Sequence, residues 1–542
     1  MAEQFINHIA DIVAHHLRAQ YTVEEYAKIQ AEIQKIVRLS KKPLKDQRQT
    51  YSYKELDRLL SGINEKQKIR KVRGVYYTPE DVVRFILKNS ALLLYKKAYG
   101  IGVLDEREKQ EFACKKTVFD PTCGTGEFLV AALKLKFECA KKTDEEMSRE
   151  EIRSIVKTVF GNDINEESVV ILKLRIFLFL LEKFGIDKLA GISGYLNRQF
   201  WTYDYLCEYE KIKKKFDLII GNPPYVEDKK AKTAAKKRYG NIYANVLIHS
   251  GLQLKRNGVM GYIIPLSYSA TPRMKELRRD LLETMGVQWL FHFSDRPDCL
   301  FTSVHQKLTV LIAKKSKKAR KEIYTSNYQY WYKAQREQLF ENLKLFRNDW
   351  VEERFIPKLG NETEECIYRK IAGCGTSFAK LVKKDEQYPV YVNLRAAFWM
   401  KAFLSPHTGG DYRMYGFSGR AWQMYAMCLL NSSLFWWFWV CVSDCWHITA
   451  KEFEMFKVPP IFDEKTVEKL AESLETRLEE TKVHIGSKQT EYEYKHKSCL
   501  EEIDRIDAYI GNLFGLTEKE QGYISQFARK YRVSKGAEDE TD

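Results

Sequence analysis

The sequence lacks the features that mark secreted and membrane-anchored chains. Its 11 cysteines are scattered over 542 residues without a Cys-x-x-Cys pair, which argues against a disulfide framework and favours reduced thiols. The N-terminus has no basic segment followed by an apolar one, so we predict no signal peptide. No apolar run approaches the roughly 20 residues that span a bilayer. We therefore expect a soluble cytoplasmic protein without a membrane partner.

Metal-binding spacing is equally scarce. Cys441, Cys445 and His447 lie close together in the sequence, but they accompany an apolar run at 434–442 that contains three tryptophans. Such a run is typical of a buried core segment, whereas a structural zinc site has four suitably spaced ligands. We expect these side chains to pack in a core and predict no metal site.

The charge balance favours a polyanionic partner. The formal net charge is +16, in a chain that is otherwise ordinary for a globular protein at 44% hydrophobic and 30% charged residues. An excess of this size favours nucleic acid, because lysines and arginines neutralise phosphates and release counterions. The alternative is a basic surface that is merely solvated.

The hydrophobic pattern divides the chain into four segments. Residues 1–70 have helical spacing, and residues 71–320 alternate short β-rich runs with helical stretches. That alternation predicts a Rossmann-like α/β domain with a mixed, mostly parallel sheet, whose ligands bind at the carboxyl ends of the strands. A basic run at 314–321 marks the expected end of this domain. An aromatic-rich segment at 321–462 and a second helical segment at 463–542 follow it.

A glycine-containing turn follows the first β-rich run of the α/β segment. Asp120 ends the run, and Gly124 and Gly126 precede an amphipathic stretch that begins at Glu127. Glycines there let the backbone approach a ligand closely, and an acid at the strand end can hold an amino or hydroxyl group. The spacing matches neither the Gly-x-Gly-x-x-Gly motif nor a phosphate-binding P-loop. By itself the motif fits a ligand site and a purely structural turn equally well.

A second acid, Asp163, ends the next β-rich run. A carboxylate at this position can accept hydrogen bonds from both hydroxyls of a ribose. The other interpretation is a helix cap, because Asp163 or Asn165 can accept a hydrogen bond from the first turn of the helix predicted at 166–183.

The most specific segment begins at Asn222. A β-favouring run at 216–221 leads directly into Asn222, Pro223, Pro224 and Tyr225. Two consecutive prolines cannot continue the strand and make the loop stiff, so its polar groups are preorganised. The Asn222 side-chain oxygen and the Pro223 carbonyl can accept two hydrogen bonds from one amino group, and Tyr225 can stack on a planar ring.

Directly after this loop the sequence becomes strongly basic. Six of the ten residues at 229–238 carry a positive charge: Lys229, Lys230, Lys232, Lys236, Lys237 and Arg238. A basic loop beside a substrate site is suited to gripping DNA phosphates, although it could equally be a solvated loop without a ligand. We predict that it contacts DNA.

In their order along the chain, these motifs resemble those of the Asn-Pro-Pro-Tyr class of amino-methyltransferases. The similarity is greatest to the gamma-type N6-adenine DNA methyltransferases of type IIG and type I restriction-modification systems, including the Eco57I-like methylases. It covers about residues 71–315 and implies S-adenosylmethionine as cofactor and double-stranded DNA as partner. A looser match at 430–434 and 458–460 implies a target-recognition domain at 321–462.

The resemblance assigns a role to each motif. Residues 74–79 look like the segment that closes over the cofactor, and Asp204 looks like the acid near the cofactor's adenine. The implied cofactor-binding residues are Tyr77, Thr78, Pro79, Asp120, Pro121, Gly124, Gly126, Phe128, Asp163, Ile164, Asp204 and Asn222. The implied catalytic residues are Asn222, Pro223, Pro224 and Tyr225, with Tyr225 and Phe301 stacking on an adenine extruded from the duplex.

Three other functions remain open at this point. Protein-glutamine and ribosomal-RNA methyltransferases share the Asn-Pro-Pro-Tyr loop, although those enzymes are usually shorter. A bifunctional restriction enzyme needs a nuclease, for which residues 1–70 are few, and a nuclease-like fragment at 493–495 lies in a stretch expected to be helical. The third is a non-enzymatic DNA-binding subunit. A separate restriction nuclease or specificity subunit is a further candidate partner.

Overall fold

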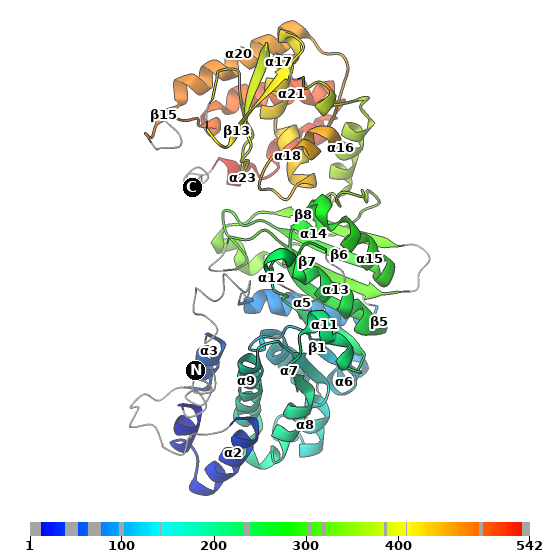
Figure 1. Cartoon of the computed structure of the whole chain (residues 1–542), viewed down its shortest axis with the longest axis vertical. Coiled ribbons are helices and arrows are strands. Elements are labelled where there is room, and N and C mark those ends of the chain that lie inside the picture. Colours follow the sequence, from blue (N-terminus) through cyan, green and yellow to red (C-terminus); the bar gives the residue numbers. More distant parts are fainter. Residues whose placement is uncertain are drawn as a thin grey trace.

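The computed structural model describes residues 12–37, 52–62, 77–96, 102–140, 142–231, 239–301, 305–316, 321–383, 387–407, 409–486 and 492–533. Figure 1 shows a long molecule with three parts along its axis. Of the two N-terminal helices, α2 (Val23–Ile36) lies at one end and α3 (Tyr53–Gly62) lies alongside the middle part. A helix-covered sheet forms the middle, and a second domain with helices and a small sheet forms the other end.

A nine-stranded sheet organises the middle of the molecule, in the order β3-β2-β1-β4-β5-β7-β6-β8-β9. The strands are β1 (Val118–Asp120), β2 (Val159–Asn162), β3 (Phe200–Trp201), β4 (Phe216–Gly221), β5 (Leu254–Pro265), β6 (Gly286–Phe293), β7 (Leu308–Lys315), β8 (Glu322–Gln329) and β9 (Phe346–Arg347). Neighbours from β3 to β5 run parallel, and β7 runs antiparallel to both β5 and β6. The expected mixed, mostly parallel α/β fold is confirmed.

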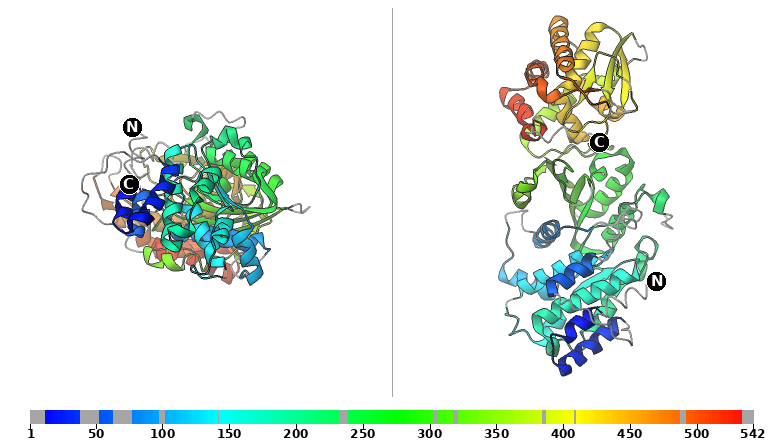
Figure 2. Two further views of the ribbon diagram at one scale, coloured as in Figure 1. Left: turned by 90° about the horizontal axis from the view of Figure 1, so that it is seen from below. Right: turned by 90° about the vertical axis from the view of Figure 1, so that its left-hand side faces the viewer.

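Helices cover both faces of this sheet, because its strands contribute to two hydrophobic cores. Val118 and Leu218 belong to a core with α5, α7 and α9, whereas Phe119 and Ile219 belong to one with α13 and α15. Successive side chains of a strand face opposite ways, so a sheet buried on both faces has apolar residues at consecutive positions. Figure 2 shows these layers from two further directions. The helices are α5 (Glu80–Leu94), α6 (Glu106–Cys114), α7 (Glu127–Cys139), α8 (Arg149–Val156), α9 (Glu166–Phe184), α10 (Ile192–Gln199), α11 (Tyr205–Glu208), α12 (Asp228–Ala231), α13 (Ile242–Gln253), α14 (Ser267–Ala270) and α15 (Lys275–Met285), with short 3-10 helices at Ile186–Lys188, Tyr209–Lys211 and Pro272–Met274.

The N-terminal helices pack on the outside of this domain. Ile29 and Ile33 of α2 and Leu60 of α3 join the core that contains α9. At the start of α2, Thr22 and Glu25 form a capping box in which each side chain accepts a hydrogen bond from the other's backbone N–H. The helical expectation for this segment therefore holds over the described residues.

The sheet continues past the predicted domain end at residue 320. β8 pairs in parallel with β6, and β9 pairs with β8. In the order of the chain, the basic run at 314–321 begins with the last two residues of β7 and ends just before β8, so it connects two strands of one sheet. Its charge therefore does not mark the end of the domain, which extends at least to Arg347.

The C-terminal domain surrounds one large hydrophobic core. Trp437, Val467 and Ile506 share this core, so the segments predicted at 321–462 and 463–542 are not separate units. Its three-stranded sheet has the order β12-β11-β13. The elements are α16 (Glu362–Gly373), β10 (Thr376–Ser377), β11 (Tyr388–Asn393), β12 (Lys401–Phe403), β13 (Tyr412–Phe417), α17 (Arg420–Asn431), α18 (Ser433–Val442), α19 (Ala450–Met455), β14 (Lys457–Val458), α20 (Glu464–Thr481), β15 (Val483–His484), β16 (Tyr492–Glu493), α21 (Leu500–Leu513), α22 (Glu518–Gln526) and α23 (Arg529–Arg532), with 3-10 helices at Phe378–Lys380 and His496–Cys499; a further 3-10 helix, Lys333–Gln338, lies between β8 and β9 of the nine-stranded sheet.

Two expectations for the C-terminal helices have different outcomes. Thr517 and Glu520 form the predicted capping box at the start of α22. The helical expectation at 493–495 is wrong, because Tyr492 and Glu493 form β16, which pairs antiparallel with β15. Two helices, α20 and α21, flank this short hairpin, so the apolar spacing at 464–510 belongs to two separate elements.

Within the described part of the chain, no single helix has the length and hydropathy to cross a bilayer. Taken together, α17 and α18 reach this length and hydropathy, but the chain bends by 63° at their junction. Both helices belong to the C-terminal core, in which Trp436, Trp437 and Trp439 are at most 1% exposed.

Candidate active site

Three polar residues lie at the carboxyl ends of neighbouring strands. Asp120 ends β1, Asp163 follows β2 and Asn222 follows β4. β1 lies between β2 and β4, so the loops after these strands meet at one edge of the sheet. The approach is close, because a Cβ atom added to Gly221 would lie only 2.7 Å from Oδ1 of Asp120. The loop at 222–225 therefore begins directly beside the Asp120 carboxyl group.

Two glycines in the left-handed region shape the turn after β1. Gly124 has a φ of +50° and Gly126, the residue before α7, has a φ of +96°. A Cβ atom on Gly126 would lie 2.1 Å from Leu172 of α9. A Cβ atom on Gly124 would meet no described atom within 4 Å, so the backbone borders open space there. The turn thus brings the N-terminus of α7 to an open region in which a ligand can approach the backbone.

Asp163 holds this turn in place. Its carboxylate accepts hydrogen bonds from the backbone N–H of Gly124 and from that of Asn165, both at 2.8 Å. The cap of α9 is Asn165, whose side chain accepts from the N–H of Glu167 at 3.0 Å. The sequence left two roles open for Asp163, ribose binding and capping of the next helix. The cap belongs to the neighbouring Asn165, and Asp163 links the loops after β1 and β2.

Two large apolar side chains are exposed beside these loops. Ile164, next to Asp163, is 70% exposed, and Tyr77 is 43% exposed. Partial burial and, next in size, the charge of Glu127 in the first turn of α7 raise the pKa of the Tyr77 hydroxyl. Burying an isoleucine side chain is worth about 1.5–3 kcal/mol. An apolar ligand group that covered these side chains would gain free energy of this order.

Asp120 is a buried acid, and no cation pairs with it among the residues that the structure describes. It is 1% exposed and accepts a hydrogen bond from the Thr122 N–H at 3.0 Å. Burial raises the pKa of Asp120 well above its usual value; the Thr122 hydrogen bond opposes this shift and the charge of Asp163 adds to it. A cationic group at this edge of the sheet would stabilise the carboxylate form.

The loop at 222–225 is tied to a segment far away in the sequence. The Asn222 side-chain N–H donates to the hydroxyl of Thr78 at 3.0 Å, and Thr78 is buried. The Tyr225 hydroxyl lies 2.6 Å from Oδ1 of Asn222 and 2.9 Å from the carbonyl oxygen of Ile263. Because a hydroxyl has one hydrogen, Tyr225 shares it between these two acceptors. Both side-chain ends of Asn222 are thus fixed in orientation.

Comparison with known proteins identifies this region. Residues 157–301, which contain β2, β4 and the loop at 222–225, match the family model described as Eco57I restriction-modification methylase. Because of this similarity we call the domain built on the nine-stranded sheet the methylase domain, and the loop at 222–225 the methylase loop. The predicted resemblance to the Eco57I-like methylases is therefore confirmed.

Relatives and solved structures extend this comparison. The chain is 26% identical over 238 residues to the type II methyltransferase M.BanIII of Aneurinibacillus aneurinilyticus, an alignment that covers 42% of this chain and 36% of the relative. It is 24% identical over 268 residues to the type II restriction enzyme and methyltransferase RM.Eco57I of Escherichia coli, covering 41% of this chain and 26% of the relative. The chain thus spans well under half the length of these curated relatives. The structure of the type IIL restriction-modification enzyme MmeI in complex with DNA has the same fold over 88% of this chain and 81% of that one, with a TM-score of 0.52 and 12% identity.

The remaining predicted residues of the methylase domain lie in different settings. Asp204 caps α11 by accepting from the Leu206 N–H at 3.0 Å. Phe128 is buried at the start of α7, next to the glycine turn. Phe301 is only 2% exposed and packs in the core, so no open face is left for a base to stack on. An aromatic residue in a loop fits a core and a site equally well, and here the core interpretation is the correct one.

The basic loop is only partly described. Lys229 and Lys230 lie on α12, just after the methylase loop, and both are exposed. Lys230 pairs with Glu227 at 3.4 Å, an exposed ion pair of small energetic weight. The other four predicted residues, Lys232, Lys236, Lys237 and Arg238, lie outside the described residues, as do residues 74–76 of the N-terminal motif.

Two residues that sequence reasoning missed position the site. Asn162 is fully buried, and its side chain bonds the carbonyls of Pro121 and Tyr203 and the N–H of Tyr203 at 3.0–3.1 Å. It thereby joins the loops after β1, β2 and β3. The sequence signal that could have identified it is its position directly before Asp163, the acid that follows β2.

Arg175 of α9 is the second, and it is 3% exposed. Its guanidinium donates to the carbonyl of Thr125 at 2.7 Å and pairs with Glu127 at 2.6 Å and Asp57 at 2.7 Å. It thus braces the glycine turn against α3. A single arginine in a strongly apolar helix is the signal that could have identified it.

Proposed function

We propose that this chain transfers a methyl group from S-adenosylmethionine to the N6 amino group of adenine in double-stranded DNA. The observation that carries the proposal is the position of Asn222. Its carboxamide is fixed by Thr78 and Tyr225 directly beside the edge formed by Asp120, Gly124 and Asp163. An amine acceptor held by Asn222 would then face a donor held at that edge.

The residues at the strand ends fit S-adenosylmethionine. Asp163 can accept from ribose hydroxyls, and the exposed Ile164 and Tyr77 can cover the adenosine. The buried Asp120, which has no cationic partner in the described part of the chain, suits the ligand's amino group. When bound, the cofactor supplies a methyl group on a positively charged sulfur.

Orientation of the amine is the proposed contribution of the loop at 222–225. The adenine amino group is a poor nucleophile because its lone pair is delocalised into the ring. Two acceptors, the Asn222 carboxamide oxygen and the Pro223 carbonyl, would hold its hydrogens and turn the lone pair toward the methyl group. Fixed acceptors of this kind act by orientation and preorganised dipoles rather than by strong basicity.

Tyr225 supports this arrangement in two ways. Its hydroxyl donates to the Asn222 oxygen at 2.6 Å and orients it, and the second lone pair of that oxygen can accept a hydrogen bond from the base. Its half-buried ring can stack on an adenine that has left the duplex. Stacking of this kind recovers part of the few kcal/mol that base extrusion costs.

The charge of the chain supports DNA as the substrate. The net charge of +16 and the exposed Lys229 and Lys230 beside the loop favour a polyanion. We propose cytoplasmic action within a restriction-modification or phage-defence system, with a separate nuclease or specificity subunit as candidate partner. The names of the relatives support this setting, although the chain spans only part of their lengths.

Expression of the chain alone in a methylation-deficient bacterial host tests the proposal. We expect sequencing of the host DNA with base-modification detection to find N6-methyladenine within one short recognition sequence. The Asn222→Ala variant, expressed to the same level, should leave the DNA unmodified. Unmodified DNA from the wild-type chain, or modified cytosine in place of adenine, would contradict it.

A further inference from the structure

An exposed tryptophan stands out in a domain that buries its other central tryptophans. Trp446 is 45% exposed, whereas Trp436, Trp437 and Trp439 are at most 1% exposed. It follows Cys445, which has a φ of +59°. That left-handed conformation is uncommon for a residue other than glycine and turns the chain sharply after α18.

A cation fixes the orientation of the Trp446 ring. The ammonium group of Lys307 lies 3.3 Å from the centroid of the indole. Lys307 is itself held in place by a buried ion pair with Asp295 at 3.2 Å. A cation over one face of an indole is a favourable interaction. The exposed part of the ring is therefore its opposite face and edge.

Lys307 brings Trp446 to the sheet edge that contains the methylase loop. Its carbonyl accepts from the Leu266 N–H at 3.0 Å, just beyond the carboxyl end of β5. Three residues earlier, the carbonyl of Ile263 contacts the Tyr225 hydroxyl. At about 3.3 Å per strand residue, the two backbone positions are about 10 Å apart. Trp446 thus reaches this edge from the C-terminal domain.

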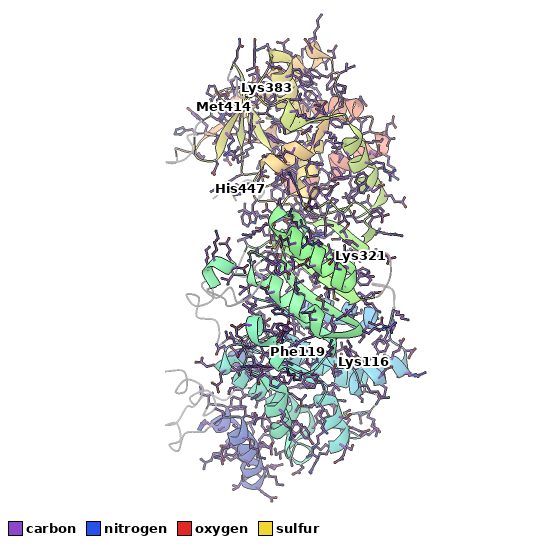
Figure 3. The ribbon with its side chains drawn as sticks, turned by 45° about the vertical axis from the view of Figure 1, so that its right-hand side comes forward. Lys116, Phe119, Lys321, Lys383, Met414 and His447 are labelled. Atoms are coloured by element: carbon purple, nitrogen blue, oxygen red, sulfur yellow. The ribbon has the colours of Figure 1, made fainter. Side chains whose placement is uncertain are left out.

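Buried lysines fix the segment that carries Trp446 across the two domains. Lys451 donates to the carbonyl of Val442 at 2.7 Å and to that of Ala270, in the methylase part, at 2.8 Å. Lys358 donates to the Ser443 carbonyl at 2.7 Å. Figure 3 labels the next residue, His447, on the side of the C-terminal domain that faces the sheet. The ring is therefore presented from a rigid support.

We propose that Trp446 enters the DNA stack and occupies the space that the extruded adenine leaves behind. Extrusion leaves a gap between two base pairs, and an indole fills such a gap because every base offers a π-face to stack on. Nearby side chains suit the flanking phosphates: the ring of His447 is exposed, and the side chain of Arg395, whose backbone bridges to His447, is 59% exposed while it pairs with Asp411 at 3.2 Å. Trp446 is thus a positioning residue for the reaction, and this role rests on the proposed DNA adenine methylation.

Methylation of two matched duplexes tests the role of Trp446. One duplex holds the recognition sequence with the target adenine paired to thymine, and the other holds it with the target adenine in a mismatch, which is easier to extrude. We expect Trp446→Ala to slow transfer on the paired duplex about ten- to a hundredfold, but only slightly on the mismatched one. Trp446→Phe should keep most of the transfer rate. When 2-aminopurine replaces the target adenine, its fluorescence should rise less on binding of Trp446→Ala than on binding of the wild-type protein.

Trp422→Ala is the matched control, because it removes another indole of the same domain, one that lies on α17 and packs against Phe462. An unchanged rate for Trp446→Ala on the paired duplex would overturn the inference. An equal loss on both duplexes would overturn it as well, since a merely structural role affects both alike. If the wild-type protein methylates neither duplex, the proposed function itself fails, and the two failures are thereby distinguished.

Discussion

The edge of the methylase sheet and the core of the C-terminal domain differ in which residues they bury. At the edge of the methylase sheet an acid, Asp120, is buried while Ile164 and Tyr77 are exposed. In the C-terminal domain the large apolar side chains of the core, such as Trp437, are buried, whereas Trp446 is 45% exposed near that edge. The comparison teaches that a buried acid or an exposed apolar side chain indicates a binding site better than the residue type alone. Buried acids and exposed apolar rings both cost free energy that a ligand can recover.

The largest expected effect is at the methylase loop, where only the chemistry should suffer. We predict that Asn222→Ala lowers the rate of methyl transfer at least about a hundredfold, as removal of one preorganised polar group does in other enzymes. Binding of S-adenosylmethionine, measured by calorimetry, should change little. A retained transfer rate would show that the carboxamide does not orient the amine.

The second prediction concerns the support beneath the glycine turn. Arg175→Met removes a buried cation and leaves Glu127, Asp57 and the Thr125 carbonyl without it. We expect the free energy of unfolding to fall by about 3 kcal/mol, measured by urea denaturation. Arg84→Met is the control, because Arg84 and Glu80 form an exposed ion pair, and its effect should stay below about 0.5 kcal/mol. Equal effects would remove the distinction between the two arginines.

The third prediction uses the buried acid. The raised pKa of Asp120 means that the folded protein holds a proton that the unfolded chain releases. The stability of the wild-type protein should therefore decrease as pH rises from about 4, the usual aspartate pKa, toward the folded-state pKa.

Asp120→Asn removes this titration and should make the cofactor-free protein more stable than the wild type at pH 8 but not at pH 4. The same change should weaken binding of S-adenosylmethionine about ten- to a hundredfold through loss of a charged hydrogen bond. Thermal unfolding at the two pH values and calorimetry with the cofactor check both parts. A variant that is less stable at pH 8 would contradict the stated cause of the pKa shift.

The smallest expected effect concerns DNA contact by the basic loop. We expect Lys229→Gln with Lys230→Gln to lower DNA affinity several-fold for all sequences and to reduce the salt slope of binding by about two. Lys213→Gln with Lys215→Gln is the matched control, because these exposed lysines precede β4 and lie at the opposite edge of the sheet. Equal slopes for the two double variants would reject this loop as a phosphate contact.

The sequence predicts the local parts of this site well. A glycine turn after β1 and a double proline after β4 are determined by neighbouring residues, so the elements at Gly124 and Pro223 could be read directly. Contacts between residues far apart in the sequence could not be predicted in this way. Thr78 reaches Asn222 across 144 positions and Arg175 reaches Asp57 across 118, because both pairs form only when the sheet and its helices assemble.

The predicted domain end and the predicted stacking role of Phe301 were wrong for the same reason, because both depend on contacts across the fold. The basic run at 314–321 resembles a linker by composition, but pairing of β8 with β6 determines where the sheet ends. The position of Phe301 in the chain matches that expected for an aromatic residue of the site, yet its side chain packs in the hydrophobic core. Composition therefore indicates what a segment can do, while topology decides which partner it finds.

The most direct test is the destination of the methyl group itself. Purified wild-type protein would receive methyl-labelled S-adenosylmethionine together with DNA, RNA and protein substrates, followed by digestion and mass spectrometry of the labelled products. We expect the label in N6-methyladenine from DNA, and its loss with Asn222→Ala. Label in N4-methylcytosine, in RNA or in glutamine, or label in adenine that survives Asn222→Ala, would contradict the assignment.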